Sequence, residues 1–288
     1  MADIDLSGYR GDAFNIIGID SYNAFTGVFD GNGHTISNFS YTSTYRDNIG
    51  LFGYVDDPNA QIKDLGLIDP NVDAGKRWYV GSLVGYLRDG TITNCYAGGG
   101  SVAGDSRVGG LVGHNYSGTI TNCYATGSVS GGGYVGGLVG YNSGTITDCY
   151  STASVTGNGV GGLVGSNYAT ITSCYSTGSV SGSHSGGLVG ANDWGTISNS
   201  YSTASVSGYR CVGGLVGDNC RTVSNCYATG SVAGTYDCVG GLVGINRRGG
   251  RVFASFWDIE TSSQTASSGG GTGKTTAEMQ TESTFQRH

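Results

Sequence analysis

One short phrase, Gly-Gly-Leu-Val-Gly, recurs along most of this chain of 288 residues. Its leucine falls at Leu83, Leu111, Leu138, Leu163, Leu188, Leu215 and Leu242, with a serine for the second glycine in the first copy. Successive leucines are 28, 27, 25, 25, 27 and 27 residues apart. A near-constant period of this length predicts one structural unit that is stacked on itself many times.

Each copy continues with a second phrase, Asn-Cys-Tyr, and a third, Gly-Ser-Val. Aligned on the residue that opens the second phrase, the copies form an aliphatic column of Ile36, Ile62, Ile92, Ile120, Ile146, Ile171, Ile197, Val223 and Val252. Three residues later a second column reads Phe39, Leu65, Cys95, Cys123, Cys149, Cys174, Ser200, Cys226 and Ser255. Nine members in each column predict nine turns.

Each unit contains three short runs rich in Val, Ile, Thr and Tyr, which favour strands and are too short for helices. Glycine supplies 55 residues and proline only two, so glycine and asparagine make the corners, where a positive φ is needed. The prediction is an all-β fold, a parallel β-helix (β-solenoid) of about nine turns with 25–30 residues in each turn. Like residues would then stack roughly 4.8 Å apart.

The two ends of the chain lack the repeat. Residues 1–30 are predicted to form an N-terminal cap, residues 31–252 the solenoid, and residues 253–288 a C-terminal cap or tail. A stacked array needs such segments because its terminal strands would otherwise expose unpaired backbone groups.

Composition narrows the partners and the compartment. Only 12% of the residues are charged and the net charge is −7, which disfavours nucleic-acid binding. No apolar run approaches the roughly 18 residues that span a membrane, and the N-terminus shows no signal segment. An extracellular or cell-surface location is predicted, with this chain cut from a longer precursor; a cytosolic protein is the alternative.

The eight cysteines divide into a column and three others. The column is interpreted as small buried side chains that fill the core, because Leu, Phe and Ser replace Cys elsewhere in it. Its single cysteines lack the paired spacing of a zinc site. Cys211 and Cys238 occupy matching loop positions in adjacent turns, which leaves a disulfide between them or two reduced thiols as the alternatives. Cys220 has no evident partner.

No motif for catalysis or for a cofactor emerges. The histidines share no metal-ligand spacing, no two carboxylates share a column as glycosidase chemistry would require, and Asp30 is typical of a turn. The segment Ser268–Thr275 ends in Gly-Lys-Thr but lacks the first glycine of a phosphate loop. The chain is therefore predicted to be non-enzymatic and free of cofactors, with no support for a structural Ca²⁺.

Two groups of residues are candidates for binding. If the cysteine column points inward, strand alternation sends the next residue outward, which predicts an aromatic ladder of Tyr96, Tyr124, Tyr150, Tyr175, Tyr201 and Tyr227. This ladder either stiffens the solenoid or offers a platform to sugars or proteins. The loop before each Gly-Gly-Leu-Val-Gly varies between copies and carries Trp78, Tyr79, Arg107, Tyr134, His184, Tyr209, Arg210 and Tyr236. Such residues are typical of contact hot spots, although exposed corners also tolerate variation.

These phrases resemble the GLUG-motif repeat over roughly residues 45–250, most specifically in Gly-Thr-Ile-Thr-Asn-Cys-Tyr-Ala-Thr-Gly-Ser-Val. Segments 25–36 and 256–279 resemble the flanks of such proteins. The resemblance implies a secreted or surface-attached bacterial or archaeal protein of adhesin-like type, and it carries no catalytic residues. GLUG repeats also accompany some immunoglobulin A-cleaving peptidases, outside the catalytic part.

The resulting functional prediction is a non-enzymatic extracellular module for adhesion or recognition, or a structural stalk, which presents variable loops to a glycan or to a host or neighbouring protein. A carbohydrate-active β-helix, such as a polysaccharide lyase or hydrolase, and a self-assembling fibre subunit are the alternatives.

Overall fold

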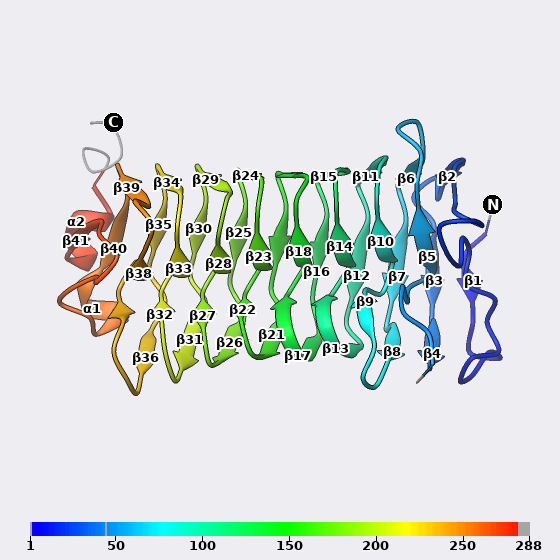
Figure 1. Cartoon of the computed structure of the whole chain (residues 1–288), viewed down its shortest axis with the longest axis horizontal. Helices are drawn as coiled ribbons and strands as arrows, with labels where there is room; N and C mark the ends of the chain where they lie inside the picture. Colours follow the sequence, from blue (N-terminus) through cyan, green and yellow to red (C-terminus); the bar gives the residue numbers. More distant parts are fainter. Residues whose placement is uncertain (1, 44, 282–288) are drawn as a thin grey trace.

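The computed structural model describes residues 2–43 and 45–281. They form a rod of stacked turns with the N-terminal segment at one end and two short helices near the other (Figure 1). The predicted all-β parallel β-solenoid is confirmed, with about eight turns where nine were expected. Every ladder between the named strands is parallel, and four sheets, here called A to D, run the length of the rod.

Sheet C carries the Thr-Ile-Thr segments. Its strands are β2 (Val28–Asp30), β6 (Gln61–Lys63), β11 (Thr91–Thr93), β15 (Thr119–Thr121), β19 (Thr145–Thr147), β24 (Thr170–Thr172), β29 (Thr196–Ser198), β34 (Thr222–Ser224) and β39 (Arg251–Phe253). Like residues pair, as in Ile92 with Ile62 and Ile120.

The first member of the aliphatic column was misaligned. Phe29, and not Ile36, pairs with Ile62, whereas Ile36 lies in sheet A beside Leu67. Phe39 consequently does not belong to the cysteine column either. The cause is the turn at residues 56–60, which lengthens this repeat and breaks the regular spacing on which the alignment depended.

Sheet A follows each asparagine corner. Its strands are β1 (Ile4–Asp5), β3 (Thr35–Ser37), β7 (Gly66–Ile68), β12 (Tyr96–Gly98), β16 (Tyr124–Ala125), β20 (Tyr150–Ser151), β25 (Tyr175–Ser176), β30 (Tyr201–Ser202), β35 (Tyr227–Ala228), β40 (Phe256–Asp258) and β41 (Thr272–Lys274). Helices α1 (Ile259–Ser262) and α2 (Thr276–Met279) flank β41, and Asp258 and Thr275 cap them.

Sheet D has two limbs. The first contains β4 (Ser40–Thr42), β8 (Asn71–Asp73), β13 (Ser101–Gly109), β17 (Ser128–Gly136), β21 (Ser154–Gly157), β26 (Ser179–Gly182), β31 (Ser205–Gly208) and β36 (Val232–Gly234). The second contains β9 (Trp78–Val80), β22 (Val160–Gly161), β27 (Ser185–Gly186), β32 (Val212–Gly213) and β37 (Val239–Gly240). Strands β13 and β17 run through both limbs without a break.

Sheet B contains the second half of each Gly-Gly-Leu-Val-Gly phrase. Its strands are β5 (Phe52–Val55), β10 (Val84–Leu87), β14 (Val112–Asn115), β18 (Val139–Asn142), β23 (Val164–Asn167), β28 (Val189–Asn192), β33 (Val216–Asn219) and β38 (Val243–Asn246). The leucine just before each of these strands from β10 onward is fully buried, so the repeated phrase forms the centre of the core.

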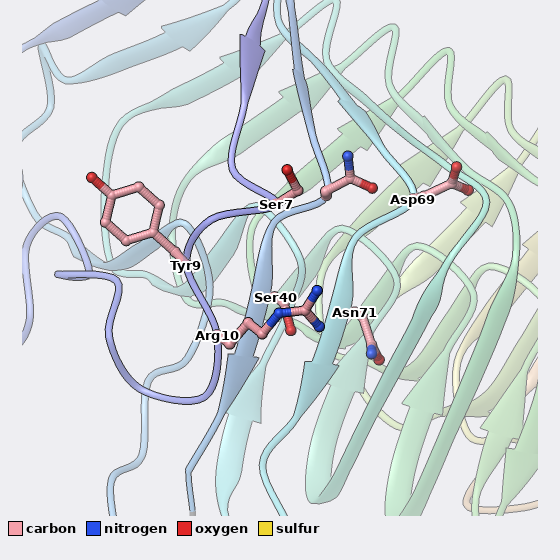
Figure 2. A pocket seen from close by; sticks show the side chains of 7 residues that line it. Ser7, Tyr9, Arg10, Ser40, Asp69 and Asn71 are labelled. Carbon is pink, nitrogen blue, oxygen red and sulfur yellow. The ribbon is translucent and has the colours of Figure 1, made fainter.

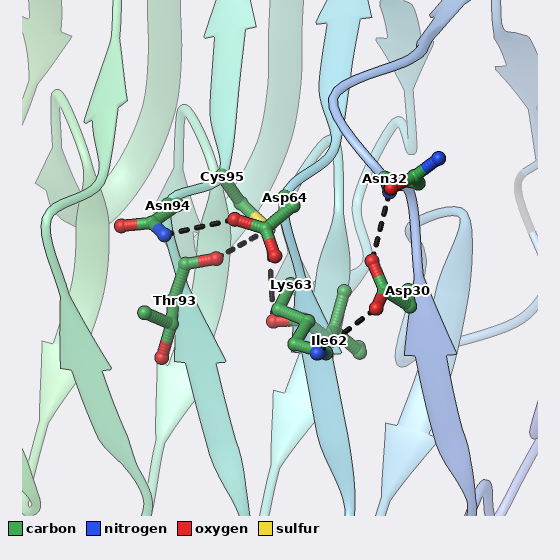
Figure 3. A network of polar contacts seen from close by, with 8 residues as sticks. All are labelled: Asp30, Asn32, Ile62, Lys63, Asp64, Thr93, Asn94 and Cys95. Atoms are coloured by element: carbon green, nitrogen blue, oxygen red, sulfur yellow. Dashed lines mark hydrogen bonds and ion pairs between the residues drawn. The ribbon is translucent and has the colours of Figure 1, made fainter.

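The asparagine of Asn-Cys-Tyr makes the corner between sheets C and A. Asn94 and Asn122 adopt the left-handed conformation, with φ of 53° and 52°, which asparagine tolerates better than most residues. The side chains also link the turns: Asn94 Nδ2 donates to Asp64 Oδ1 at 2.8 Å, and Asn122 Nδ2 donates to Asn94 Oδ1 at 2.7 Å. Figure 3 shows the start of this network beside the Asp30–Lys63 ion pair.

The cysteine column does more than fill space. The backbone N–H of Cys123 donates to Cys149 Sγ of the next turn at 3.4 Å, and that of Cys174 donates to Ser200 Oγ at 3.1 Å. Each side chain thus accepts from an otherwise unpaired backbone group at the corner. This explains why serine replaces cysteine in the column, since both side chains are small and can accept a hydrogen bond. Burial raises the pKa of Cys95 and that of Cys226 to about 12, so both thiols stay protonated.

A second buried polar column closes sheet B. Asn142 Nδ2 donates to Asn167 Oδ1 at 2.9 Å, Asn167 Nδ2 donates to Asn192 Oδ1 at 2.9 Å, and each amide also donates to a nearby carbonyl. The ladder comprises Asn115, Asn142, Asn167, Asn192, Asn219 and Asn246. Because these amides are bonded to one another through the core, they set the register of neighbouring turns.

Replacing Asn167 with Ala will lower the free energy of unfolding by about 2–3 kcal/mol, because buried amide and carbonyl groups in adjacent turns lose their partners. Urea denaturation followed by circular dichroism measures the change. Thr156→Ala, at an exposed position of β21, is the control and should stay within about 0.5 kcal/mol of the wild type. Equal stability of Asn167→Ala and the control would contradict the structural role of the ladder.

The Cys149 position separates packing from hydrogen bonding. Cys149→Ala will destabilise the protein by about 1–3 kcal/mol because the N–H of Cys123 loses its acceptor, whereas Cys149→Ser will stay close to the wild type. The midpoint of thermal unfolding of the two variants, measured side by side, tests this. If serine is as damaging as alanine, the column serves only to pack the core.

Candidate functional site

Each repeat places two variable residues seven positions apart, on either side of Val-Gly-Gly-Leu-Val-Gly or a close variant of it. The first is a corner residue in or beside sheet D, and the second is the third residue of a sheet B strand. The pairs are Tyr79 and Tyr86, Arg107 and His114, Tyr134 and Tyr141, Gly159 and Ser166, His184 and Ala191, Cys211 and Asp218, and Cys238 and Ile245. The chain folds back within the phrase, so the two side chains meet: the ring centroids of Tyr79 and Tyr86 are 5.2 Å apart and those of Tyr134 and Tyr141 5.8 Å.

The corner residues are conformationally unusual. Tyr79, Arg107 and Tyr134 have φ of 61°, 55° and 51°, in the left-handed region, which costs a residue with a Cβ about 1 kcal/mol or more. Gly159 occupies the same column with φ of 68°, so the turn itself needs no side chain. Large side chains held at strained positions indicate a role for what they contact.

The first half of the rod carries a cluster of rings that we call the aromatic face. It comprises Tyr54, Trp78, Tyr79, Tyr86, Arg107, His114, Tyr116, Tyr134, Tyr141 and Tyr168. Its base is the sheet B column, in which Tyr54 stacks on Tyr86 at 4.8 Å and His114 meets Tyr86 and Tyr141 edge to face at 4.6 and 4.8 Å. Of the predicted site residues, Trp78, Tyr79, Arg107 and Tyr134 are brought together here.

Sequence reasoning missed the base of this face. Tyr86, His114 and Tyr141 were not among the predicted residues, although the variable position between the last glycine of the phrase and the following asparagine was visible in every copy. The absent piece of information was that the two variable positions lie side by side in space.

Arg107 lies among three rings of this face. Its Cζ is 5.1 Å from the ring centroids of both Tyr79 and Tyr141 and 5.8 Å from that of Trp78, all within the range of a cation–π contact. Its Nη1 donates to Tyr79 Oη at 3.4 Å. Trp78 itself is positioned by Asp105, whose carboxylate accepts from the indole N–H at 3.2 Å.

His114 is the buried centre of the face, with 7% of its surface exposed. Neither ring nitrogen has a conventional hydrogen-bond partner, but the ring meets Tyr86 and Tyr141 edge to face, a geometry in which an N–H can point at a π surface. Burial, with a smaller contribution from the positive charge of Arg107, lowers the pKa of His114 to about 3. The imidazole is therefore neutral at physiological pH.

The outer rings of the face remain open to solvent. Trp78 is 46% exposed, Tyr116 52% and Tyr134 41%. Exposed rings supported from below by other rings are held in place, so a ligand that packs on them has little side-chain entropy to remove.

The other predicted loop residues form a second group. Tyr209 and Tyr236 meet at 4.5 Å between ring centroids, and His184, Arg210 and Tyr236 line a pocket of about 230 Å³ together with Arg247. Arg247 pairs with Asp218 at 3.1 Å. Burial raises the pKa of Asp218, and the charge of Arg247 opposes this effect. The turn of Gly159 and Ser166 separates this group from the aromatic face along the chain.

The thiols of Cys211 and Cys238 also border this pocket. The two residues lie in adjacent turns, with the backbone N–H of Val212 donating to the carbonyl of Cys238 at 2.9 Å. All eight cysteines are free thiols in this structure, and the Cys211–Cys238 disulfide stays a prediction.

The six ladder tyrosines lie on sheet A. Successive rings from Tyr96 to Tyr227 are 4.7–5.0 Å apart with planes within 8° of parallel. Neighbouring rings therefore cover part of each other's faces, and no sugar ring fits between two of them. This packing suits a stiffening ladder, and its use as a binding platform stays a prediction.

A polar pocket of about 240 Å³ lies at the N-terminal end. Figure 2 shows its lining: Ser7, Tyr9 and Arg10 from the N-terminal segment, Asn38 and Ser40 from the first turn, and Asp69 and Asn71 from the next. Tyr9 also packs edge to face on Phe14 at 6.1 Å, which ties this segment to the solenoid.

The part of the chain that the structure describes contains no group of three or more His, Cys, Asp or Glu residues arranged to hold a metal ion. None of the helices within it is long and apolar enough to cross a membrane.

Comparison with known proteins adds the family. The model of the GLUG motif matches five consecutive segments, residues 77–103, 104–130, 131–156, 156–181 and 181–207. Residues 77–207 are GLUG-motif repeats. In the structure, each GLUG repeat is one turn of the solenoid, and the aromatic face is built mainly on the first three.

Two further similarities are informative. A stretch of 109 residues, 37% of this chain, is 37% identical to halomucin of Haloquadratum walsbyi, of which it spans only 1%. The crystal structure of a proposed immunoglobulin A1 protease from Bacteroides ovatus superposes with a TM-score of 0.58, over 96% of this chain and 77% of that one. At 24% identity, this second similarity shows a shared fold alone.

The buried imidazole predicts a pH dependence of stability. The folded state holds the pKa of His114 at about 3, below the ordinary value of 6.5, so the unfolded state binds the proton first and stability is lost as the pH falls below about 6.5. We expect the wild type to lose about 2 kcal/mol more than His114→Tyr between pH 7 and pH 5. Tyrosine already occupies the neighbouring positions of the column. Urea titrations at both pH values measure the difference, and parallel pH profiles of the two proteins would contradict the assignment.

Proposed function

We propose that this protein is a non-enzymatic recognition module of the cell surface or extracellular space, which adheres to glycans through its aromatic face. The observation that carries the proposal is the set of open, rigidly supported rings of Trp78, Tyr116 and Tyr134 around Arg107. Aromatic faces pack against the apolar face of a sugar ring, and the phenol and indole tips hydrogen-bond its hydroxyls.

The scaffold supports this role. A solenoid repeats the same corner at each turn, so side chains at the corner can vary without disturbing the core. The low content of charged residues and the similarity to a stretch of halomucin support a surface or secreted location. A structural stalk would need the scaffold but not the strained aromatic corners.

A protein partner is the main competing ligand, because Trp, Tyr and Arg are also the residues of protein interfaces. We favour a glycan because the open rings surround a single cation and the base of the face is made of further rings, with few backbone edges that a peptide could pair with.

The enzyme and fibre alternatives lack comparable support. Asp218 is the carboxyl with a raised pKa near a pocket, but it is paired with Arg247 as a structural carboxylate would be. The terminal strands are partly covered: the segment that contains Ser267 and Gly269 bonds to Val243, and β41 extends sheet A.

Binding to immobilised polysaccharides, measured by biolayer interferometry, tests the proposal. We expect Trp78→Ala and Tyr134→Ala each to weaken binding about tenfold, because each removes an exposed ring of the face. Tyr22→Ala is the matched control, since this tyrosine is 95% exposed and lies outside the face, and its affinity should equal that of the wild type.

Three results would contradict the proposal. They are the absence of binding to any polysaccharide in a broad panel, equal losses in the Tyr22 control, and release of reducing or unsaturated sugar ends from a bound polymer. The last result would support the carbohydrate-active alternative, with Asp218→Asn as the variant to examine.

A further inference from the structure

We infer that Arg107 is a receptor for the carboxylate of an acidic sugar, so that the glycan bound by the aromatic face carries uronic acid residues. This inference rests on the proposed function and specifies its ligand. Its basis is a guanidinium that has ring partners but no anionic partner.

The hydrogen-bond donors of Arg107 are largely unused. A guanidinium has five N–H groups, and the contact with Tyr79 Oη at 3.4 Å engages one of them. Its Nε is buried and has no hydrogen-bond partner. Within residues 2–43 and 45–281, no carboxylate forms an ion pair with Arg107.

Other arginines of the rod behave differently. Arg88 pairs with Asp56 at 2.8 Å and Arg247 with Asp218 at 3.1 Å. The carboxylate of Asp105, two residues from Arg107, accepts from the indole of Trp78 instead. Asp47 likewise accepts from the backbone N–H of Trp78 at 2.9 Å. The neighbouring carboxylates therefore position the rings and leave the cation of Arg107 open to an external anion.

The surroundings strengthen such a contact. The rings of Tyr79, Tyr141 and Trp78 shield the guanidinium from part of the solvent, and an ion pair is stronger where the local dielectric constant is low. Stacked rings also restrict the plane of the guanidinium, which suits the planar, two-pronged geometry of a carboxylate.

The same surroundings favour a sugar acid over a free anion. Tyr134 and Trp78 present exposed rings beside Arg107, and these match the apolar face of a pyranose whose carboxylate reaches the cation. The next corner is Gly159, which has no side chain and leaves space beside Tyr134 for the sugar to lie in. With a net charge of −7, the chain does not attract anions in general, so a preference for uronates must come from this local site.

Binding of the full chain to three polymers tests the inference: polygalacturonate, the same polymer after chemical reduction of its carboxyl groups, and dextran sulfate. We expect the wild type to bind polygalacturonate at least tenfold more tightly than the reduced polymer, since a charge-assisted pair is lost on reduction. Dextran sulfate should bind more weakly than polygalacturonate.

Variants at Arg107 locate the effect. Arg107→Gln should abolish the preference for the uronate polymer while binding to the reduced polymer changes little, and Arg107→Lys should retain part of the preference. Arg251→Gln, at an exposed position of sheet C, is the matched control and should leave the preference intact. The comparison of the two polymers on the wild type needs no variant, so it stands even if a substitution at Arg107 impairs folding.

The outcomes separate the inference from the function on which it rests. Equal binding of polygalacturonate and its reduced form would overturn the inference and leave glycan recognition intact. Dextran sulfate binding as tightly as polygalacturonate would overturn the specificity for carboxylate. Failure to bind any carbohydrate would contradict the proposed function and the inference together.

Discussion

The turn-to-turn hydrogen bonding of parallel strands is the interaction on which the rest of this structure depends. One turn buries too few apolar side chains to offset the entropy of ordering its backbone, so each turn is stable only against its neighbours. Register is therefore critical, and two polar columns hold it. The asparagine ladder of sheet B bonds amide to amide through the core, and the Cys/Ser column accepts backbone N–H groups at the opposite corner.

This strict register has a functional consequence. Whatever stands at a variable position is placed directly beside its counterparts in the adjacent turns and beside the residue seven positions further on. Four tyrosines, an arginine and a histidine at such positions become a contiguous face without any change in the core. The strained backbone at Tyr79, Arg107 and Tyr134 costs stability that Gly159 avoids, which is consistent with side chains kept for binding and not for folding.

Much of the fold could be predicted because the repeat makes local and global preferences agree. The stacking of like residues, the inward cysteines and the glycine and asparagine corners all follow from the period and the alternation of side chains. The prediction failed at the first turn, where the longer loop at residues 56–60 shifted the register and Ile36 was taken for Phe29. It also treated the cysteines as packing alone, because a hydrogen bond to the next turn's backbone leaves no trace in composition.

The sequence by itself determined the architecture of this protein, since a period of 25 to 28 residues with apolar columns can bury its core only by stacking. It also identified half of the aromatic face, because Trp78, Tyr79, Arg107 and Tyr134 vary against a constant background. Only the tertiary structure decided that these loop residues pack on Tyr86, His114 and Tyr141, and that Arg107 faces rings without a carboxylate partner. The physical reason is that the fold-back within each Gly-Gly-Leu-Val-Gly phrase, and the choice of partner at each corner, are set by contacts between segments and not by the residues of one segment.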